Sequence, residues 1–282
     1  MTFLDTVSLG HYVFEIAAVL RESLFINGIL HNTEVWYGLN KSQVQELEDV
    51  DKLLLRRILR APISTPSEAF YLELGLLPIP YIIKGRRVMF LHYLLQLDND
   101  EMLSEFFFAQ WNSPSNNDWV LTVKDDLKEL SITCNLTDIR SQSKETFKKL
   151  VKDSCMNIAF SNLTNLQKSH SKMSNVKYAD FKMQSYFHDG SIDARSLFLY
   201  RTRMIRVRNN YQGSSPENQL CPLCKDEIDT QEHLLTCEKI HTTPPNVRYG
   251  DIFMDDLSKI KDTLAALKSS FKFREDVLNA KE

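Results

Sequence analysis

The residues best suited to chemistry lie close together near the C-terminal end of the sequence. Cys221 and Cys224 are separated by two residues, His233 follows after eight more, and Cys237 lies four positions beyond His233. A tight turn can bring two thiolates onto one ion, and a helix presents positions i and i+4 on the same face. Three thiolates and one imidazole are a ligand set of tetrahedral zinc. The spacing therefore predicts a zinc knuckle formed by Cys221, Cys224, His233 and Cys237.

The fourth ligand has an alternative in the sequence. His241 lies four positions after Cys237, so it satisfies the same helical spacing as His233. We favour His233 because it lies inside the compact segment, whereas His241 lies close to Pro244, which we expect to end a helix. Either choice gives four protein ligands and leaves no coordination position for water. We therefore predict a structural Zn²⁺ and not a catalytic one.

A second group of candidates consists of basic residues. Five arginines, Arg195, Arg201, Arg203, Arg206 and Arg208, precede the knuckle in a stretch that has no acidic residue between Asp193 and Glu217. Arginine pairs with phosphate through a bidentate fork, so we favour phosphate contact slightly over an ordinary solvated helix face. A smaller patch lies on an earlier helix, where the ordinary exposed face is at least as good an interpretation. The predicted nucleic-acid-binding residues are Arg201, Arg203, Arg206, Arg208, Lys84, Arg86 and Arg87.

No residue set in the sequence makes a convincing active site. The segment YADF at 178–181 has one carboxylate where two-metal phosphoryl transfer needs a pair. The pairs Asp125-Asp126 and Asp255-Asp256 fall in expected helices and are interpreted as exposed charges. There is no glycine-rich phosphate loop and no Gly-x-Ser-x-Gly motif. We therefore expect no catalysis by this chain on its own.

Composition limits the class of protein. The chain has 282 residues, of which 43% are hydrophobic and 25% charged, which is typical of a soluble globular protein. Its formal net charge of −3 means that binding to nucleic acid would depend on local patches. No apolar run is long enough for a membrane span, and the first residues lack the basic region of a signal peptide. Clustered cysteines indicate a reducing compartment, so we expect an intracellular protein in the nucleus, the cytoplasm or both, with no membrane contact.

Apolar periodicity predicts a mainly α fold. The expected helices cover 11–32, 40–59, 66–74, 81–97, 102–110, 119–130, 144–166, 196–211, 251–267 and 269–280. The first of them is expected to end or bend at Asn27-Gly28. Asn40 and Gln43 have the spacing of a capping box, Thr65 is a candidate N-cap, and Gly75 is a candidate helix end. The polar stretches 112–117 and 167–176 are expected to be linkers, the second of them mobile. The loop 212–219 is expected to lead into the knuckle.

The order of several short motifs resembles the region after the palm in reverse transcriptases of non-LTR (LINE-type) retrotransposons. No single motif is decisive, but their order is specific, and the resemblance covers most of the chain, with the weakest correspondence between Trp111 and Ser191. The motifs are NGIL at 27–30, TEVWY at 33–37, LEDVD at 47–51, LLRRI at 54–58, TPSEA at 65–69, LELG at 72–75, PI at 78–79, RR at 86–87, FLHYL at 90–94, RTR at 201–203 and the knuckle at 221–237.

The resemblance implies a division into three parts. Residues 1–110 look like the helical thumb that grips a template–primer duplex, 111–190 like a helical connecting region, and 191–282 like a C-terminal region with the arginine-rich helix, the zinc knuckle and terminal helices. The family usually spaces its last two ligands His-x4-Cys, whereas this chain has His-x3-Cys. The palm with its catalytic aspartates, the fingers and an endonuclease are absent from the sequence.

The resemblance thus implies a non-catalytic, nucleic-acid-binding fragment of a retroelement reverse transcriptase. Its expected partners are RNA, DNA or both, together with the palm and fingers of the same polyprotein. The alternative is a truncated or domesticated copy that acts as a helical protein-interaction scaffold, with a zinc ion that is purely structural.

Overall fold

A computed structural model describes residues 12–98, 100–115, 118–211 and 216–280 and confirms the mainly helical fold. Within these residues the only β pairing consists of two isolated bridges, Leu74 with Met183 and Leu220 with Ile228. The first ten elements are α2 (Val13–Leu20), η2 (Arg21–Ile26), α3 (Asn27–Ile29), η3 (Thr33–Val35), α4 (Lys41–Leu59), α5 (Ser67–Leu74), α6 (Ile79–Gln96), α7 (Met102–Asn112), α8 (Trp119–Glu129) and α9 (Leu136–Ser141). The others are α10 (Lys144–Ser169), η4 (Ser171–Met173), η5 (Ser185–Phe187), α11 (Ala194–Arg201), α12 (Arg208–Tyr211), α13 (Pro216–Gln219), η6 (His233–Leu235), η7 (Tyr249–Phe253) and α14 (Leu257–Asn279).

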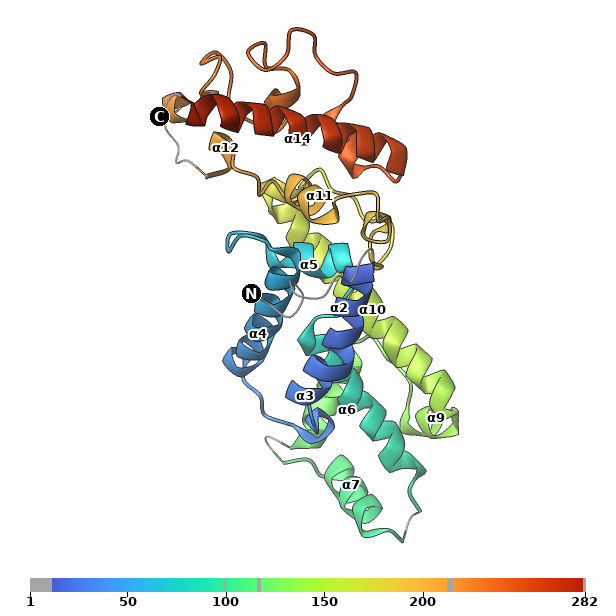
Figure 1. The fold of residues 1–282 in the computed structure, drawn as a ribbon. Helices are drawn as coiled ribbons and strands as arrows, with labels where there is room; N and C mark the ends of the chain where they lie inside the picture. Colours follow the sequence, from blue (N-terminus) through green and yellow to red (C-terminus); the bar gives the residue numbers. More distant parts are fainter. Residues whose placement is uncertain (1–11, 99, 116–117, 212–215, 281–282) are drawn as a thin grey trace.

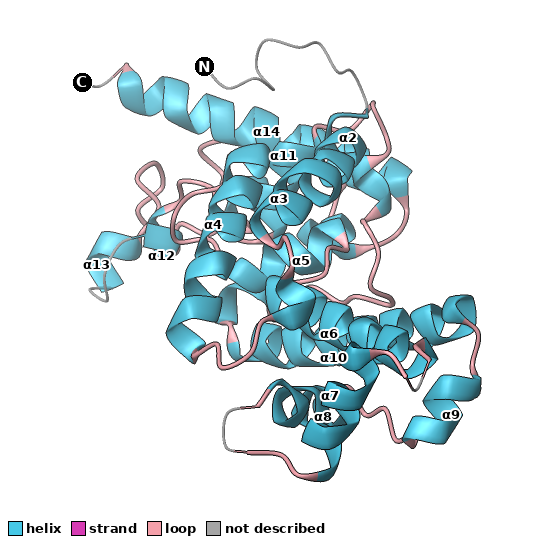
Figure 2. Ribbon diagram, turned by 90° about the horizontal axis from the view of Figure 1, so that it is seen from below, coloured by secondary structure: helices cyan, strands magenta, loops and turns pink. Residues whose placement is uncertain are grey.

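Helix α6 is the centre of the first half of the molecule. It packs against α4, α7, α8, α9 and α10, and Figure 2 shows α6 and α10 side by side. Val88, Leu91 and Leu95 are buried in this cluster. A Cβ atom at Gly85 would lie 3.3 Å from Sγ of Cys155 on α10, so a glycine here permits the close approach of the two helices. The packing of apolar side chains around α6 therefore explains why its apolar residues face several directions.

The predicted ends of α4 and α5 agree closely with the structure. Asn40 and Gln43 form the expected capping box before α4. Helix α5 starts at Ser67 with Pro66, not Thr65, in the N-cap position. Gly75 ends α5 with a φ of +62°, and a Cβ atom there would lie 2.4 Å from the backbone of Lys182. Glycine is thus required at Gly75 by both backbone conformation and space.

Four of the expected helices have a different form. The stretch 11–32 was expected to be a helix that ends or bends at Asn27-Gly28; it is an uninterrupted helical run of α2, the π-helix η2 and α3 that ends at Ile29, and His11 lies outside the described residues. The expected helix 196–211 ends at Arg201, and Arg203 adopts a φ of +55°. The two expected terminal helices form one helix, α14, whose N-terminus is capped by Asp256. None of the described helices is long and apolar enough to cross a membrane.

The polar stretch 167–176 is packed against the core, so its interpretation as a mobile linker is wrong. Nε2 of Gln167 donates to the backbone oxygens of Met173 and Val176, both at 2.7 Å. Met173 and Val176 are themselves buried. The other expected linker, 112–117, follows the end of α7, and its Asn116 and Asn117 lie outside the described residues. Residues 212–215 of the loop before the knuckle also lie outside them, whereas 216–219 form α13.

One hydrophobic cluster runs through all three of the expected parts. It includes Phe14 and Leu72 from the first part, Leu163 from the second, and Leu234 and Leu267 from the third. In Figure 1, α14 lies at one end of the molecule and α7 at the other, with α11 and α5 between them. The boundaries near 110 and 190 therefore do not separate independent cores.

Candidate metal centre

Four ligand atoms converge in the segment that contains the predicted knuckle. Sγ of Cys221, Cys224 and Cys237 and a ring nitrogen of His233 all lie within 4.8 Å of one another. The two sulfurs of Cys221 and Cys237 are 3.9 Å apart, and Sγ of Cys224 is 3.4 Å from Nε2 of His233. Sulfur ligands at roughly 2.3 Å from a tetrahedral ion are separated by roughly 3.8 Å. The cluster therefore has the donor set and the spacing to hold one metal ion.

The first two cysteines are held by a short hairpin-like turn. The bridge between Leu220 and Ile228 closes it, and the backbone N–H of Cys221 donates to the oxygen of Glu227 at 2.7 Å. Lys225 adopts a φ of +64°, and its N–H donates to the oxygen of Cys221 at 2.9 Å. This reversal of the chain places both thiols on the same side of the turn.

The second ligand pair comes from a short 3-10 turn and not from the expected α-helix. His233 opens η6, and the N–H of Cys237 donates to the backbone oxygen of His233 at 2.8 Å. The hydrogen bond from residue i+4 to residue i keeps the two side chains on one face. Leu234 and Leu235, between the ligands, are buried in the main core. The i, i+4 spacing thus brings the two ligands together although the helix is shorter than predicted.

The structure favours His233 over His241 as the fourth ligand. Nε2 of His241 lies 3.0 Å from the backbone oxygen of Leu234 and 2.9 Å from Oγ of Ser270 on α14. His241 therefore fastens η6 to α14, whereas His233 directs Nε2 at Cys224.

Glu227 orients the imidazole of His233. Oε2 of Glu227 lies 2.8 Å from Nδ1 of His233, on the side of the ring opposite Cys224. A metal-bound histidine commonly donates its second ring N–H to a carboxylate, which fixes the tautomer and raises the basicity of the ligand nitrogen. The sequence reasoning did not find this residue, because an acidic side chain six positions before a histidine has no distinctive pattern.

The thiols of the cluster differ in acidity when no ion is bound. Burial raises the pKa of Cys221 to about 12. Burial also acts to raise the pKa of Cys224, but hydrogen bonds from the backbone N–H groups of Asp226 and Glu227 and from His233 lower it to about 7. The thiolate is the form that binds metal, and Cys224 forms its thiolate more readily than Cys221 does. Binding of an ion at Cys221 must therefore release a proton.

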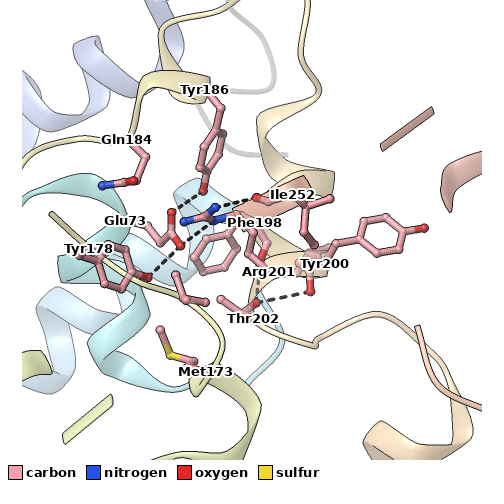
Figure 3. Close-up of polar contacts among 12 residues, drawn as sticks. Glu73, Met173, Tyr178, Gln184, Tyr186, Phe198, Tyr200, Arg201, Thr202 and Ile252 are labelled. Atoms are coloured by element: carbon pink, nitrogen blue, oxygen red, sulfur yellow. Dashed lines mark hydrogen bonds and ion pairs between the residues drawn. The ribbon is translucent and has the colours of Figure 1, made fainter. Parts of the chain in front are cut away.

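Arg201 is a buried ion-pair partner, so its predicted role in phosphate contact is wrong. Nε of Arg201 donates to Oε1 of Glu73 at 2.9 Å, and Nη1 donates to the backbone oxygen of Ile252 at 2.7 Å. The hydroxyl groups of Tyr178 and Tyr186 also donate to Glu73, each at 2.8 Å (Figure 3). With 3% of its surface exposed, Arg201 cannot reach a ligand in solution.

The other three arginines of the predicted set before the knuckle have different environments. Arg203 is partly buried, forms an ion pair with Glu232 and lies over the ring of Tyr249. Arg208 is partly buried, and its Nη1 donates to the backbone oxygen of Leu220 at 3.3 Å. Arg206 is exposed and makes no ion pair with another described residue. Arg206 is thus the most accessible of the four.

The smaller basic patch is largely engaged in packing. Arg87 is buried and forms a bidentate ion pair with Asp126, at 2.6 and 2.9 Å, so it cannot contact phosphate. The same contact shows that Asp126 is buried and not an exposed charge; burial raises its pKa. Arg86 donates to the backbone oxygen of Leu30, and Lys84 forms an ion pair with Glu129. Arg87 therefore cannot make the predicted contact with nucleic acid. Arg86 and Lys84 are also engaged in contacts within the protein.

Comparisons of this chain with models of protein families, with curated proteins and with solved structures give no match. The arguments for function therefore depend on the residues and contacts of the chain itself.

Proposed function

We propose that the cluster of Cys221, Cys224, His233 and Cys237 holds a structural zinc ion. Three thiolates with one imidazole are a common zinc set, and soft thiolate ligands select against magnesium, calcium and manganese. Four protein donors fill a tetrahedral shell, so no coordination position is left for a substrate or for water. The role of the ion is therefore to hold the turn at 221–228 against η6.

We further propose that this chain binds nucleic acid without catalysing a reaction on its own, as a C-terminal fragment of a retroelement reverse transcriptase. The observations that support this proposal are the closed Cys3His cluster and the exposed Arg206, which precedes the cluster in the sequence. The order of the motifs along the sequence supports the same function. Because the cysteines of the cluster are all free thiols, we infer a reducing compartment, the nucleus or the cytoplasm.

A salt titration tests the proposed function. Binding of single-stranded and duplex RNA and DNA to the full chain is measured by mobility shift at about 50 and about 200 mM salt. Neutralised phosphates release counterions, so affinity should fall steeply as salt is added. Binding that is indifferent to salt, or no binding to any of these probes, would reject the proposal.

A second candidate, a protein-interaction scaffold, is favoured by apolar side chains on α7. Met102 is 70% exposed and Phe106 is 63% exposed, and Leu103 lies between them. Val50 and Leu53 on α4 are also exposed. Apolar patches of this kind are typical of surfaces that another protein covers, here the palm and fingers expected from the resemblance.

The two candidate functions differ in which binding activity they predict, and a substitution on α7 separates the two activities. Phe106→Glu should abolish capture of a separately expressed palm and fingers while leaving oligonucleotide affinity unchanged. If wild-type protein captures the palm and fingers but binds no nucleic acid, the scaffold is the correct function.

A further inference from the structure

A cavity of about 610 Å³ lies beside the knuckle, where the loop after α4 meets the segment after α11 and the C-terminal helix α14. Helix α14, which carries Arg274 and Glu275, lies at one end of the molecule (Figure 1). The cavity is within the range of small-ligand sites. Its wall combines apolar and cationic side chains from three distant parts of the sequence, namely Pro62, Met204, Val207, Arg206, Arg208 and Arg274.

Positive charge dominates the wall of this cavity. Three arginines line the cavity together with one carboxylate, that of Glu275, and Arg274 is paired with both Glu275 and the buried Asp229 behind the wall. Arg206 makes no ion pair among the described residues. The hydrogen bond from Arg208 to the backbone oxygen of Leu220 uses one of the five N–H donors of the Arg208 side chain. Arg274 is 4% exposed, and its Nε is a buried donor without a hydrogen-bond partner. Donors of all three arginines are therefore left unsatisfied by the protein, and the charges of Arg206 and Arg208 have no ion-pair partner among the described residues.

The knuckle positions two of these arginines. Oδ2 of Asp229, a fully buried residue directly after the bridge at Ile228, accepts from Nη2 of Arg274 at 2.6 Å. The same oxygen accepts from the backbone N–H of Arg208 at 2.8 Å. Nη1 of Arg208 donates to the backbone oxygen of Leu220, the residue before Cys221. Hydrogen bonds to Asp229 and Leu220 thus connect the segment of the metal centre to Arg208 and Arg274 in the wall of the cavity.

We propose that this cavity binds one phosphate group of a nucleic-acid strand, with Arg206 and Arg208 as its ligands and Arg274 as a positioning residue. This inference depends on the proposed nucleic-acid binding and assigns its site. Guanidinium forks match the oxygens of phosphate, and charge-assisted hydrogen bonds of this type are the stronger ones. The apolar wall of Pro62, Met204 and Val207 gives the attached sugar or base a surface to pack against.

The test uses the full chain and a charge-matched control. Arg206→Gln removes the accessible ligand, and Arg140→Gln removes one exposed positive charge from α9, which lies away from α14 in the molecule (Figure 1). Fluorescence anisotropy measures the affinity of each protein for a single-stranded oligonucleotide with a 5′-phosphate and for the same strand with a 5′-hydroxyl group. Helix content and bound metal are measured first, to show that both variants are folded.

We expect Arg206→Gln to weaken binding about ten-fold and Arg140→Gln to have almost no effect. Loss confined to the 5′-phosphorylated strand identifies a terminal phosphate, and equal loss for both strands identifies a phosphodiester within the chain. In a second measurement, phenylglyoxal labels exposed arginines, and bound oligonucleotide should protect Arg206 but not Arg140.

Two results would overturn the inference in different ways. Equal affinities of the two variants, with salt-dependent binding retained, would reject the cavity and leave the proposed function intact. Absence of binding by the wild-type protein would reject both.

Discussion

Nε of Arg201 on α11 lies 2.9 Å from Oε1 of Glu73 on α5, and neither side chain is exposed by more than 3%. The two residues are separated by 128 positions, so this ion pair joins the first and last parts of the chain. Glu73 also accepts from Tyr178 and Tyr186 in the connecting region. One buried carboxylate therefore ties all three regions of the chain to one core.

Removal of the cation from this network should destabilise the whole molecule. Arg201→Met leaves the carboxylate of Glu73 buried without a positive partner, which costs about 3–5 kcal/mol. Denaturant unfolding followed by helix content measures the loss, and Arg206→Gln is the matched control with an exposed arginine. A change of less than about 1 kcal/mol in Arg201→Met would show that water or another group compensates the carboxylate.

The phenols around Glu73 should make the protein sensitive to alkali. Burial, followed by the charge of Glu73, raises the pKa of Tyr178 and Tyr186 well above the usual 10.0. The folded chain keeps both protons, so this stabilisation is complete below about pH 10 and is lost as pH rises towards the folded-state pKa. We expect the free energy of unfolding to fall above about pH 10, by up to about 1.4 kcal/mol per pH unit for each phenol.

The comparison of wild type with Tyr186→Phe isolates this effect, because the other buried tyrosines are common to both proteins. Denaturant unfolding is measured at several values between about pH 9 and about pH 11, around the ordinary tyrosine pKa. The variant should show a shallower loss of stability, and identical slopes would contradict the assignment.

Metal content distinguishes His233 from His241. His233→Ala should lose the bound ion, because it removes one of the four donors, whereas His241→Ala should bind one ion per chain as the wild type does. His241→Ala should still lower stability by about 1–3 kcal/mol, since the oxygens of Leu234 and Ser270 lose a buried partner. Elemental analysis of the purified proteins gives the answer, and metal loss in His241→Ala alone would reverse the assignment.

The carboxylate of Glu227 should tune affinity for the metal. Glu227→Ala removes the hydrogen-bond partner of Nδ1 of His233, and loss of such a partner typically weakens metal binding about 10- to 100-fold. Competition with a chromogenic chelator measures the change. Glu238→Ala, which removes an exposed acid next to Cys237, is the control and should have little effect.

Chelation should loosen the C-terminal region more than the region around α6. Structural zinc contributes free energy of folding directly, and Cys221 and Cys237 are buried beside Leu234 and Leu235 of the main core. Cys224→Ser should therefore increase hydrogen exchange across 216–253, with smaller changes in α6 and α8. Cys134→Ser, outside the cluster, is the control. Unchanged exchange with full metal loss would mean that the core alone holds this region.

Local physics explains what sequence reasoning could find. A capping box needs only Asn40 and Gln43 three positions apart, and a helix end in the left-handed region needs only Gly75. The ligand set is local too, because Cys221 to Cys237 fall within one short segment whose turns bring them together. Each of these features depends on neighbours in the sequence, so the pattern of residues was sufficient.

Tertiary structure decided which charges are accessible. Arg87 and Arg201 are arginines like Arg206, yet Asp126 and Glu73, 39 and 128 positions away, pair with them in the core. Burial of a charge is tolerated only with such a partner, and no local pattern reveals a partner at that distance. The sequence by itself determined the helical fold and the four residues that could hold a metal ion. Only the packing of distant segments decided that Arg201 supports the core while Arg206 faces a cavity.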